Sequence, residues 1–387
     1  MGEARVATAA TGTGRRGWVD LAKGLAIVMV VGYHALLFLE PADVGVSPLG
    51  RARVPLELYP MPAFFLLAGV MQQRLRVSPW SLVWRRRVLP LVYLLVVWSL
   101  VRFVFFTALP QVRSDGPPQS GRDPWRLLLV LVAPDSIYWF LWSLAAVTVV
   151  TWLLRDHPRV SVVGALAVSS VVTSGLLVTG VFAWDRTLAF LAPFVVGVHA
   201  GPAVLRAVES TTWRRVAVVG AGTAVLLALL VAVPVARRVP GAALLAQGAV
   251  LATVLGASVL VAARPWTRPL QSVGRLSLPV YLLHVYPVAL LTIAVAAVPA
   301  LHSTPARGLP LVLLVTALAL GASLLLVRVV PARSRLLTTP SALLRARSAA
   351  GPEARELAGA PAVGTVTEPV AAELSTTVAD LPKEDRR

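Results

Sequence analysis

The sequence predicts an all-α integral membrane protein, and three features support this class. Of its 387 residues, 57% are hydrophobic and only 14% are charged, and the mean hydropathy is +0.76, unlike that of a soluble protein. Several apolar runs reach the roughly 18 to 25 residues that an α-helix needs to cross about 30 Å of hydrocarbon. None of these runs alternates apolar and polar residues, as the strands of a lipid-facing β-barrel would.

About ten transmembrane helices are expected, each an apolar run between charged segments or segments rich in proline and glycine. In chain order they lie near residues 19–39, 54–73, 88–109, 136–154, 160–181, 187–205, 215–236, 241–263, 276–299 and 309–331. The first run follows Arg5, Arg15 and Arg16, as in a signal peptide, but it is too long and lacks a convincing cleavage site, so a retained helix is expected. The second run is interrupted by Glu57 and two prolines, and the seventh and eighth are separated by the segment ARRVPG.

Residues 18–332 are expected to form the membrane domain, preceded by a cytoplasmic segment, 1–17. From residue 333 to residue 387 the chain has no periodic apolar residues, which is typical of a disordered tail, here expected in the cytoplasm. The longest internal loop, about 110–135, is expected outside the cell, and its WRLLLVLV portion is expected to dip back toward the bilayer.

The net charge of +18 is largely explained by membrane topology. With ten helices, the segments on the side of the termini carry 18 arginines and the opposite segments carry nine. Because cytoplasmic loops are enriched in Lys and Arg, both termini are expected to be cytoplasmic in a multi-pass protein of the cell membrane. The bilayer is thus an expected partner and nucleic acid is not, whereas the oligomeric state is not determined by the sequence.

The chain has no cysteine, which excludes disulfides, Cys-ligated zinc, iron–sulfur clusters and an acyl-cysteine intermediate. None of the five histidines forms an HxxxH or HExxH pair, so no metal site is predicted from a local motif. A site built from histidines distant in sequence is left open.

The first expected helix carries two polar residues that need an explanation. Lys23 and His34 are eleven residues apart, which places them on one face of a helix, about 16 Å apart along its axis. Asp20, one turn before Lys23, can pair with it. Lys23 is also consistent with snorkelling to the cytoplasmic headgroups, and His34 with a buried histidine bonded to a neighbouring helix.

The stretch DLAKGLAIVMVVGYH resembles the first helix of the acyltransferase 3 family. These multi-pass membrane enzymes move acyl groups from cytoplasmic acyl-CoA to extracytoplasmic acceptors, often sugars of cell-surface glycans. The family motif is Arg or Lys, ten residues and then His, which Lys23 and His34 match, and Asp20 stands where an aspartate is common. The resemblance implies that His34, Lys23 and Asp20 belong to the catalytic site.

Further motifs follow in the order of the family. PMPAFFLLAGVM (60–71) is similar to its second-helix pattern, with Ala68 in place of the usual serine and Tyr59 in place of a frequent upstream histidine. YWFLWSL (138–144) and VGRLSLPVYLLH (273–284) resemble the signatures of later helices. The matches span residues 20 to 284.

The segment WRRRVLP (84–90) resembles the family's basic loop before the third helix. Arg87 fits the second arginine of that pattern, but the first falls on Trp84, so Arg85 or Arg86 would have to substitute. The resemblance implies that Lys23, Arg85, Arg86 and Arg87 bind coenzyme A, since guanidinium groups bind phosphate in a forked geometry. Each arginine is equally explained as ordinary cytoplasmic charge.

His34 would then act as the general base that takes the proton of the acceptor hydroxyl, because a neutral imidazole with a pKa near 6.5 suits this task. Trp139, Ser277, Tyr281 and His284 are the expected substrate-binding residues. Trp139 is also consistent with an aromatic anchor at the membrane interface, and His284 with polar packing. No cofactor is expected to be permanently bound, and acyl-CoA, most simply acetyl-CoA, is the expected donor.

The leading hypothesis is therefore an O-acyltransferase that acts on a hydroxyl of an extracytoplasmic glycan or glycosylated lipid. The alternative is a transporter or flippase for a glycan or lipid precursor, which would use Lys23 and His34 in a polar path. Many transporters carry paired broken helices in their two halves, and no such pair is evident in the sequence. A non-catalytic scaffold would leave both residues unexplained.

Overall fold

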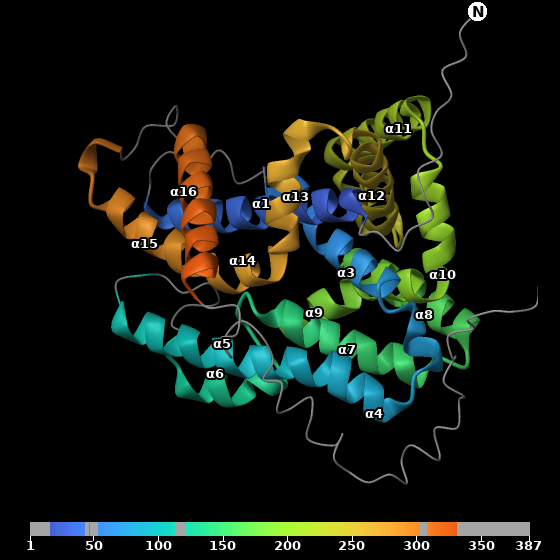
Figure 1. Ribbon diagram of the computed structural model, residues 1–387, viewed down its shortest axis with the longest axis horizontal. Helices are drawn as coiled ribbons and strands as arrows, with labels where there is room; N and C mark the ends of the chain where they lie inside the picture. The colour runs from blue at the N-terminus through green and yellow to red at the C-terminus, as the bar shows by residue number, and fades with distance from the viewer. Residues whose placement is uncertain are drawn as a thin grey trace, which may run out of the picture. The chain divides into compact units, whose positions relative to one another are not determined.

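The computed structural model describes residues 16–42, 46, 53–110, 112, 121–301 and 308–330, and every regular element in these ranges is a helix (Figure 1). The α-helices are α1 (Gly17–Leu39), α2 (Arg53–Leu58), α3 (Pro60–Val70), α4 (Trp80–Val83), α5 (Leu89–Ala108), α6 (Pro124–Leu128), α7 (Trp139–Leu153), α8 (Pro158–Thr173), α9 (Phe182–Ala189), α10 (Leu191–Glu209), α11 (Trp213–Ala232), α12 (Ala242–Val261), α13 (Arg268–Arg275), α14 (Ser277–Leu283), α15 (Val285–Ala296) and α16 (Gly308–Val329). The predicted all-α class is confirmed. The expected tail, 333–387, and most of the N-terminal segment lie outside the described residues.

Six stretches of the described chain are long and apolar enough to cross a membrane: Gly17–Leu39, Trp80–Ala108, Phe182–Glu209, Trp213–Ala232, Ala242–Val261 and Gly308–Val329. The pair α14 and α15 is a seventh candidate, bent by 45°. Three shorter apolar helices, Leu56–Val70, α7 and α8, occupy the remaining expected ranges. Each of the ten predicted ranges thus contains a helix, but the number of crossings and the orientation of the termini stay predictions.

The expected helices 54–73 and 276–299 are each broken beside a proline. The range 54–73 divides into α2 and α3 at Tyr59, directly before Pro60, which has no N–H to continue the helical hydrogen bonds. The range 276–299 bends between α14 and α15 at His284. Pro287 lies four residues after Leu283, so its ring displaces the Leu283 carbonyl from the regular helical ladder. This bend places His284 at the break.

Helix α1 is the central element of the described fold and packs against α3, α12, α13, α14, α15 and α16 (Figure 1). Glycines permit the close crossing of α1 and α13. A Cβ atom on Gly24 would lie 2.1 Å from the carbonyl oxygen of Leu270, and one on Gly274 would lie 1.8 Å from that of Asp20. Side chains at these positions would force the helices apart, so the glycines fix the depth at which α1 is held.

Helices α3 and α10 cross in the same way. A Cβ atom on Gly69 would lie 2.2 Å from the carbonyl oxygen of Phe194, and one on Gly197 would lie 2.5 Å from that of Leu66. Gly69, the glycine at the end of the second-helix motif, therefore has a packing role. This crossing holds α3 beside α1, and the buried hydroxyl of Tyr59 adds a hydrogen bond of 2.9 Å to the carbonyl of Ala22.

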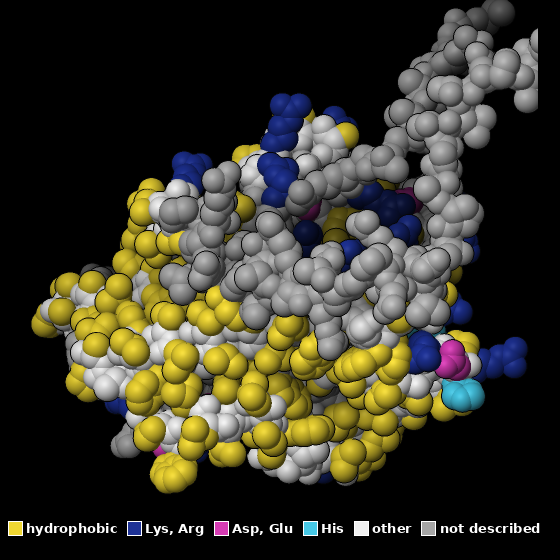
Figure 2. Space-filling view, turned by 60° about the horizontal axis from the view of Figure 1, so that its bottom comes forward, with side chains coloured by type: hydrophobic (Ala, Val, Ile, Leu, Met, Phe, Trp, Pro, Cys, Tyr) yellow, Lys and Arg dark blue, Asp and Glu magenta, His cyan; other side chains and the backbone are white. Residues whose placement is uncertain are grey.

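The surface agrees with a protein embedded in lipid. In Figure 2, hydrophobic side chains cover most of the visible face, whereas Lys and Arg side chains gather toward its upper edge and around a hollow there. Large apolar residues such as Leu313, Leu314 and Leu318 of α16 are exposed. A contiguous apolar surface of this kind is expected to face the bilayer.

The segment before α7 returns from the end of α5 and is held by side chains. The guanidinium of Arg122 donates hydrogen bonds to the carbonyls of Phe106 (2.7 Å), Leu109 (3.3 Å), Pro110 (2.5 Å) and Val112 (2.6 Å). These bonds satisfy carbonyls that the end of α5 leaves without helical partners. Residues 113–120 lie outside the described ranges.

The expected WRLLLVLV portion forms α6 and a short 3₁₀ turn, Leu129–Leu131. The indole N–H groups of Trp142 and Trp184 donate to the carbonyls of Leu131 (2.9 Å) and Val132 (3.0 Å). Several of its apolar side chains are exposed, and its placement in the bilayer stays a prediction.

Candidate active site

A cavity of about 380 Å³ lies between α1, α2, α3, α7, α9 and α14, next to the histidine of the first-helix motif. Its walls are formed by Val30, Tyr33, His34, Leu37, Leu56, Glu57, Pro60, Met61, Asp135, Ser136, Ile137, Trp139, Phe182, Arg186, Phe190 and Tyr281. The size falls in the range of small-molecule sites, and a mostly apolar lining with a few polar groups is typical of them. The described chain therefore places His34, Trp139 and Tyr281, all predicted site residues, in one cavity wall.

His34 is held by a helix carbonyl and by a second histidine. Its Nδ1 lies 2.8 Å from the carbonyl oxygen of Val30 and 3.2 Å from Nε2 of His284. The Nδ1 of His284 lies 2.8 Å from the carbonyl oxygen of Tyr281. Carbonyls accept, so each Nδ1 carries the proton, and Nε2 of His284 accepts from His34. In this assignment Nε2 of His34 carries the lone pair that a general base requires.

His284 contacts His34 and does not line the cavity. Its side chain is fully buried, and the two imidazole rings meet edge to face with their centroids 4.9 Å apart. The bend between α14 and α15 occurs at this residue, which brings the end of the VGRLSLPVYLLH motif against α1. His284 therefore contacts the candidate base, and its contact with substrate stays a prediction.

Aromatic side chains form one side of the cavity. Trp139 stacks on Phe190 with centroids 6.0 Å apart and meets Phe182 edge to face at 5.9 Å. The hydroxyl of Tyr281 donates to the carbonyl of Ile137, which ties α14 to the segment before α7. Ser277, at the start of α14, is partly exposed and is not among the cavity-lining residues. The structure therefore brings Trp139 and Tyr281 to the site but not Ser277.

Lys23 lies toward the other end of the same unbroken helix. Its Nζ is 3.3 Å from Oδ1 of Asp20, whose side chain is buried, and the expected ion pair is therefore present. At 1.5 Å per residue, eleven residues separate Lys23 from His34 by about 16 Å along α1. Lys23 does not line the cavity, so any joint action of the two residues requires a ligand that extends along α1.

The three arginines of the WRRRVLP segment lie within a π-helical turn, Trp84–Val88, that joins α4 to α5. Arg85 is half-buried, whereas Arg86 and Arg87 are exposed. The turn packs against α7, and among the described elements it has no extensive contact with α1. π-Turns inside α-helices are frequent at functional sites.

The charged residues of the cavity were not predicted from the sequence. Glu57 and Arg186 form an ion pair of 3.4 Å, and Asp135 pairs with Arg126. Asp135 and Arg186 lie near the ends of expected helices, where charge is ordinarily explained by solvent exposure. For Glu57, its position as an acidic residue within the apolar second run was the available sign of a functional role. In the described chain, no group of three or more His, Asp or Glu residues could hold a metal ion.

The acyltransferase 3 family model, described as an acyltransferase domain, matches residues 16–328. This range includes every residue that lines the cavity as well as Lys23 and the arginines. No curated protein and no solved structure gives a significant match to the chain.

Proposed function

Because the chain belongs to the acyltransferase 3 family, and is therefore a membrane acyltransferase, we propose that it transfers an acetyl group from acetyl-CoA to a hydroxyl group. The donor binds from the cytoplasm, and the acceptor is an extracytoplasmic glycan or glycosylated lipid. The protein acts in the cell membrane as a multi-pass enzyme.

The observation that supports this proposal is the state of His34 in the cavity. Its Nδ1 proton is directed to Val30 and His284, so the lone pair is on Nε2, and the ring forms part of the cavity wall. A base in a cavity of about 380 Å³ with apolar and aromatic walls is suited to a reaction from which water must be excluded.

The reaction follows from this geometry. Nε2 of His34 accepts the proton of the acceptor hydroxyl as its oxygen attacks the thioester carbonyl carbon. The new carbon–oxygen bond forms, the carbon–sulfur bond breaks, and coenzyme A leaves as a thiolate that takes the proton back. His284 acts as a positioning residue that keeps the proton of His34 on Nδ1.

Lys23 is proposed to bind the phosphate end of the donor, coenzyme A. A coenzyme A molecule carries its phosphates at one end and its thioester at the end of a long pantetheine arm. The separation of about 16 Å between Lys23 and His34 suits an arm that lies extended along α1. Arg85, Arg86 and Arg87 supply further cations for the phosphates, since Arg86 and Arg87 are exposed.

The acceptor side is assigned to the aromatic wall. Trp139 lines the cavity beside Tyr281, although most of its ring is packed on neighbouring aromatic residues, and aromatic faces pack against the C–H faces of sugars. Ser277 and His284 are not among the cavity-lining residues, so we expect them to contribute less to acceptor binding than Trp139 and Tyr281.

The test is transfer by the purified protein in lipid nanodiscs that contain an envelope extract from its own cells. With labelled acetyl-CoA, mass spectrometry should find O-acetylated glycans or glycolipids. His34→Ala should lower the rate by about 10² to 10⁴-fold, since a positioned base contributes this much. The matched control is His157→Ala, because His157 is exposed at the start of α8. Full activity of the folded His34→Ala protein would overturn the assignment of the base.

The bend in α14 and α15 supports a transporter as the second candidate. Broken helices beside a central site are typical of secondary transporters, which carry them in paired halves. Among the described helices α14 and α15 form one bent span of this kind, whereas paired halves would carry two. Movement of a labelled glycolipid across the vesicle membrane without acylation would favour this function.

A further inference from the structure

Two carboxylates lie in the wall of the cavity that holds His34, and each is paired with an arginine from another element. Glu57 of α2 pairs with Arg186 of α9, and Asp135, before α7, pairs with Arg126 of α6. Both carboxylates are cavity-lining residues. Neither takes part in the proton transfer described above, so their presence in a mostly apolar cavity needs a separate explanation.

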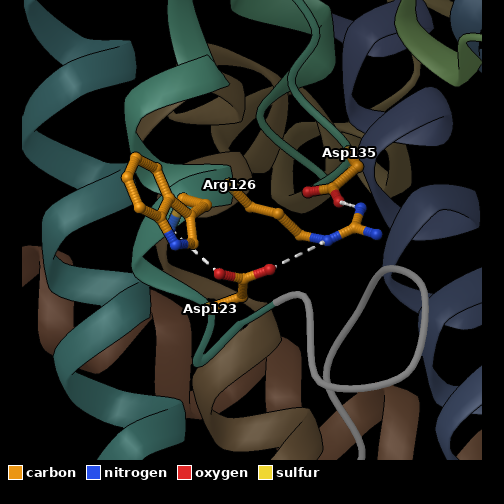
Figure 3. Close-up of polar contacts among 4 residues, drawn as sticks. Asp123, Arg126 and Asp135 are labelled. Carbon is orange, nitrogen blue, oxygen red and sulfur yellow. Dashed lines mark hydrogen bonds and ion pairs between the residues drawn. The ribbon is translucent and has the colours of Figure 1, made fainter.

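Asp135 is held in place by Arg126 of α6, which does not line the cavity. Figure 3 shows Arg126 lying between Asp135 and Asp123, with its guanidinium directed to both carboxylates. The Nε of Arg126 is 3.6 Å from Oδ2 of Asp123, and Asp123 caps α6 by accepting a hydrogen bond of 2.9 Å from the backbone N–H of Trp125. The arginine is thus fixed by a capped helix, which orients the Asp135 carboxylate before a ligand arrives.

Glu57 and Arg186 are the more accessible pair. Their side chains are 38% and 35% exposed, which leaves both within reach of a ligand that enters from solvent. The guanidinium of Arg186 also lies over the ring of Phe182, 5.5 Å from its centroid. The cavity wall therefore combines a carboxylate, a guanidinium and the aromatic surface that includes Trp139.

The charged groups at this wall are already paired with one another, which disfavours an anionic ligand. Of the charged residues that line the cavity in the described chain, Glu57 and Asp135 are negative and Arg186 is positive. Arg186 faces Glu57 and Arg126 faces Asp135, so each positive group at this wall already has a partner, and an anionic ligand would have to compete with a carboxylate for it. In a partly desolvated cavity, repulsion between that ligand and the competing carboxylate is stronger than in water. Hydroxyl groups, in contrast, donate to carboxylates and accept from guanidinium groups.

We propose that Glu57 and Asp135, with Arg186 and Trp139, form a subsite for an uncharged sugar, and that this subsite excludes sugars that carry a carboxylate or phosphate near the reacting hydroxyl. The proposal rests on the proposed acyl transfer, whose acceptor it specifies. Arg126 is a positioning residue for Asp135 and does not itself contact the sugar.

The probes are p-nitrophenyl glucoside and p-nitrophenyl glucuronide, which differ in a hydroxymethyl against a carboxylate at one carbon. Acetyl transfer by the full chain in nanodiscs should give a kcat/KM at least about tenfold higher for the glucoside, equivalent to one unfavourable charge contact. Equal use of the two probes, or preference for the glucuronide, would overturn the subsite while leaving acyl transfer established.

Two variants test whether the preference for the glucoside over the glucuronide arises from the carboxylates of the cavity. Glu57→Gln and Asp135→Asn remove a negative charge and keep the size of the side chain. Each should raise the KM for the glucoside about tenfold, leave the KM for acetyl-CoA unchanged, and reduce the discrimination against the glucuronide. Asp156→Asn is the matched control, because Asp156 is exposed on the loop before α8. Equal effects of the control and the two variants would contradict the proposal.

A binding measurement separates this inference from the reaction. In the His34→Ala protein, thermal stabilisation by the glucoside should exceed that by the glucuronide, although no acetyl group is transferred. Absence of this difference overturns the subsite. If the difference is present but the wild-type protein transfers no acetyl group to glycans or probes, the proposed function fails and the subsite stands.

The swapped variant Glu57→Arg/Arg186→Glu controls for folding, because it keeps the ion pair and exchanges its ends. It should unfold at about the wild-type temperature but show a weaker preference for the glucoside. An unchanged preference would show that the position of the charge does not matter, contrary to the proposal.

Discussion

Nε2 of His284 lies 3.2 Å from Nδ1 of His34, although 250 residues separate the two histidines in sequence. The contact joins the first-helix motif to the last family signature at the bend of α14 and α15. We therefore expect His284 to act by positioning His34.

His284→Gln should retain more activity than His284→Leu, because a glutamine carbonyl can still accept from Nδ1 of His34 whereas leucine cannot. We expect the leucine variant to lose about tenfold or more in kcat, the worth of one hydrogen bond of about 1.4 kcal/mol, with little change in KM for acetyl-CoA. Steady-state kinetics on both variants provides the measurement. A large change in KM alone would instead indicate direct substrate contact.

Lys23→Ala should raise the KM for acetyl-CoA, whereas Lys23→Arg should retain much of the activity, because the family motif accepts either cation. The buried Asp20 loses its ion pair with Lys23 in the alanine variant, so thermal unfolding must be measured in parallel. Lys23→Met/Asp20→Asn removes both charges and tests binding without leaving one half of this ion pair behind. Normal donor binding by this double variant would show that Lys23 is a structural residue.

Arg87→Ala should weaken donor binding more than Arg74→Ala, because Arg87 fits the family position and lies in the π-turn before α5. Both side chains are exposed, which makes Arg74 a matched control. The KM for acetyl-CoA is measured for each variant. Equal effects would point to a general contribution of cytoplasmic charge to topology.

Gly24→Ala should destabilise the protein, because its Cβ would lie 2.1 Å from the carbonyl oxygen of Leu270. Separation of α1 and α13 should cost about 1 to 3 kcal/mol, as in other overpacked cores. The control is Gly321→Ala on α16, where no atom lies within 4 Å of the added Cβ. The thermal unfolding temperature in detergent should fall for the first variant and hold or rise for the second.

Single cysteines can test the orientation, since the chain has none. Trp125 and Trp80 are exposed, so a cysteine at either position is accessible to a reagent on its own side of the membrane. We expect an impermeant thiol reagent to label Trp125→Cys in intact cells and Trp80→Cys only after permeabilisation. The reverse pattern would place the arginine segment outside and would exclude its proposed role in donor binding.

The sequence by itself determined the membrane class, the approximate positions of the helices and the family. Each of these depends on a local pattern, since a helix that crosses a bilayer must be apolar along its length. The common face of Lys23 and His34 was also a local property, because the helical repeat fixes it. Pro60 and Pro287 were visible in the sequence, but how far each would bend its helix was not.

Only the tertiary structure decided which residues surround His34. The partners Glu57 and Arg186 are 129 residues apart, and His34 and His284 are 250 apart. Such contacts depend on the depth and angle at which helices cross. Glycines such as Gly24 permit a close crossing, but their positions in the sequence do not predict its angle. A charged residue at a helix end has the same local pattern whether it faces solvent or a cavity, and packing alone separates the two.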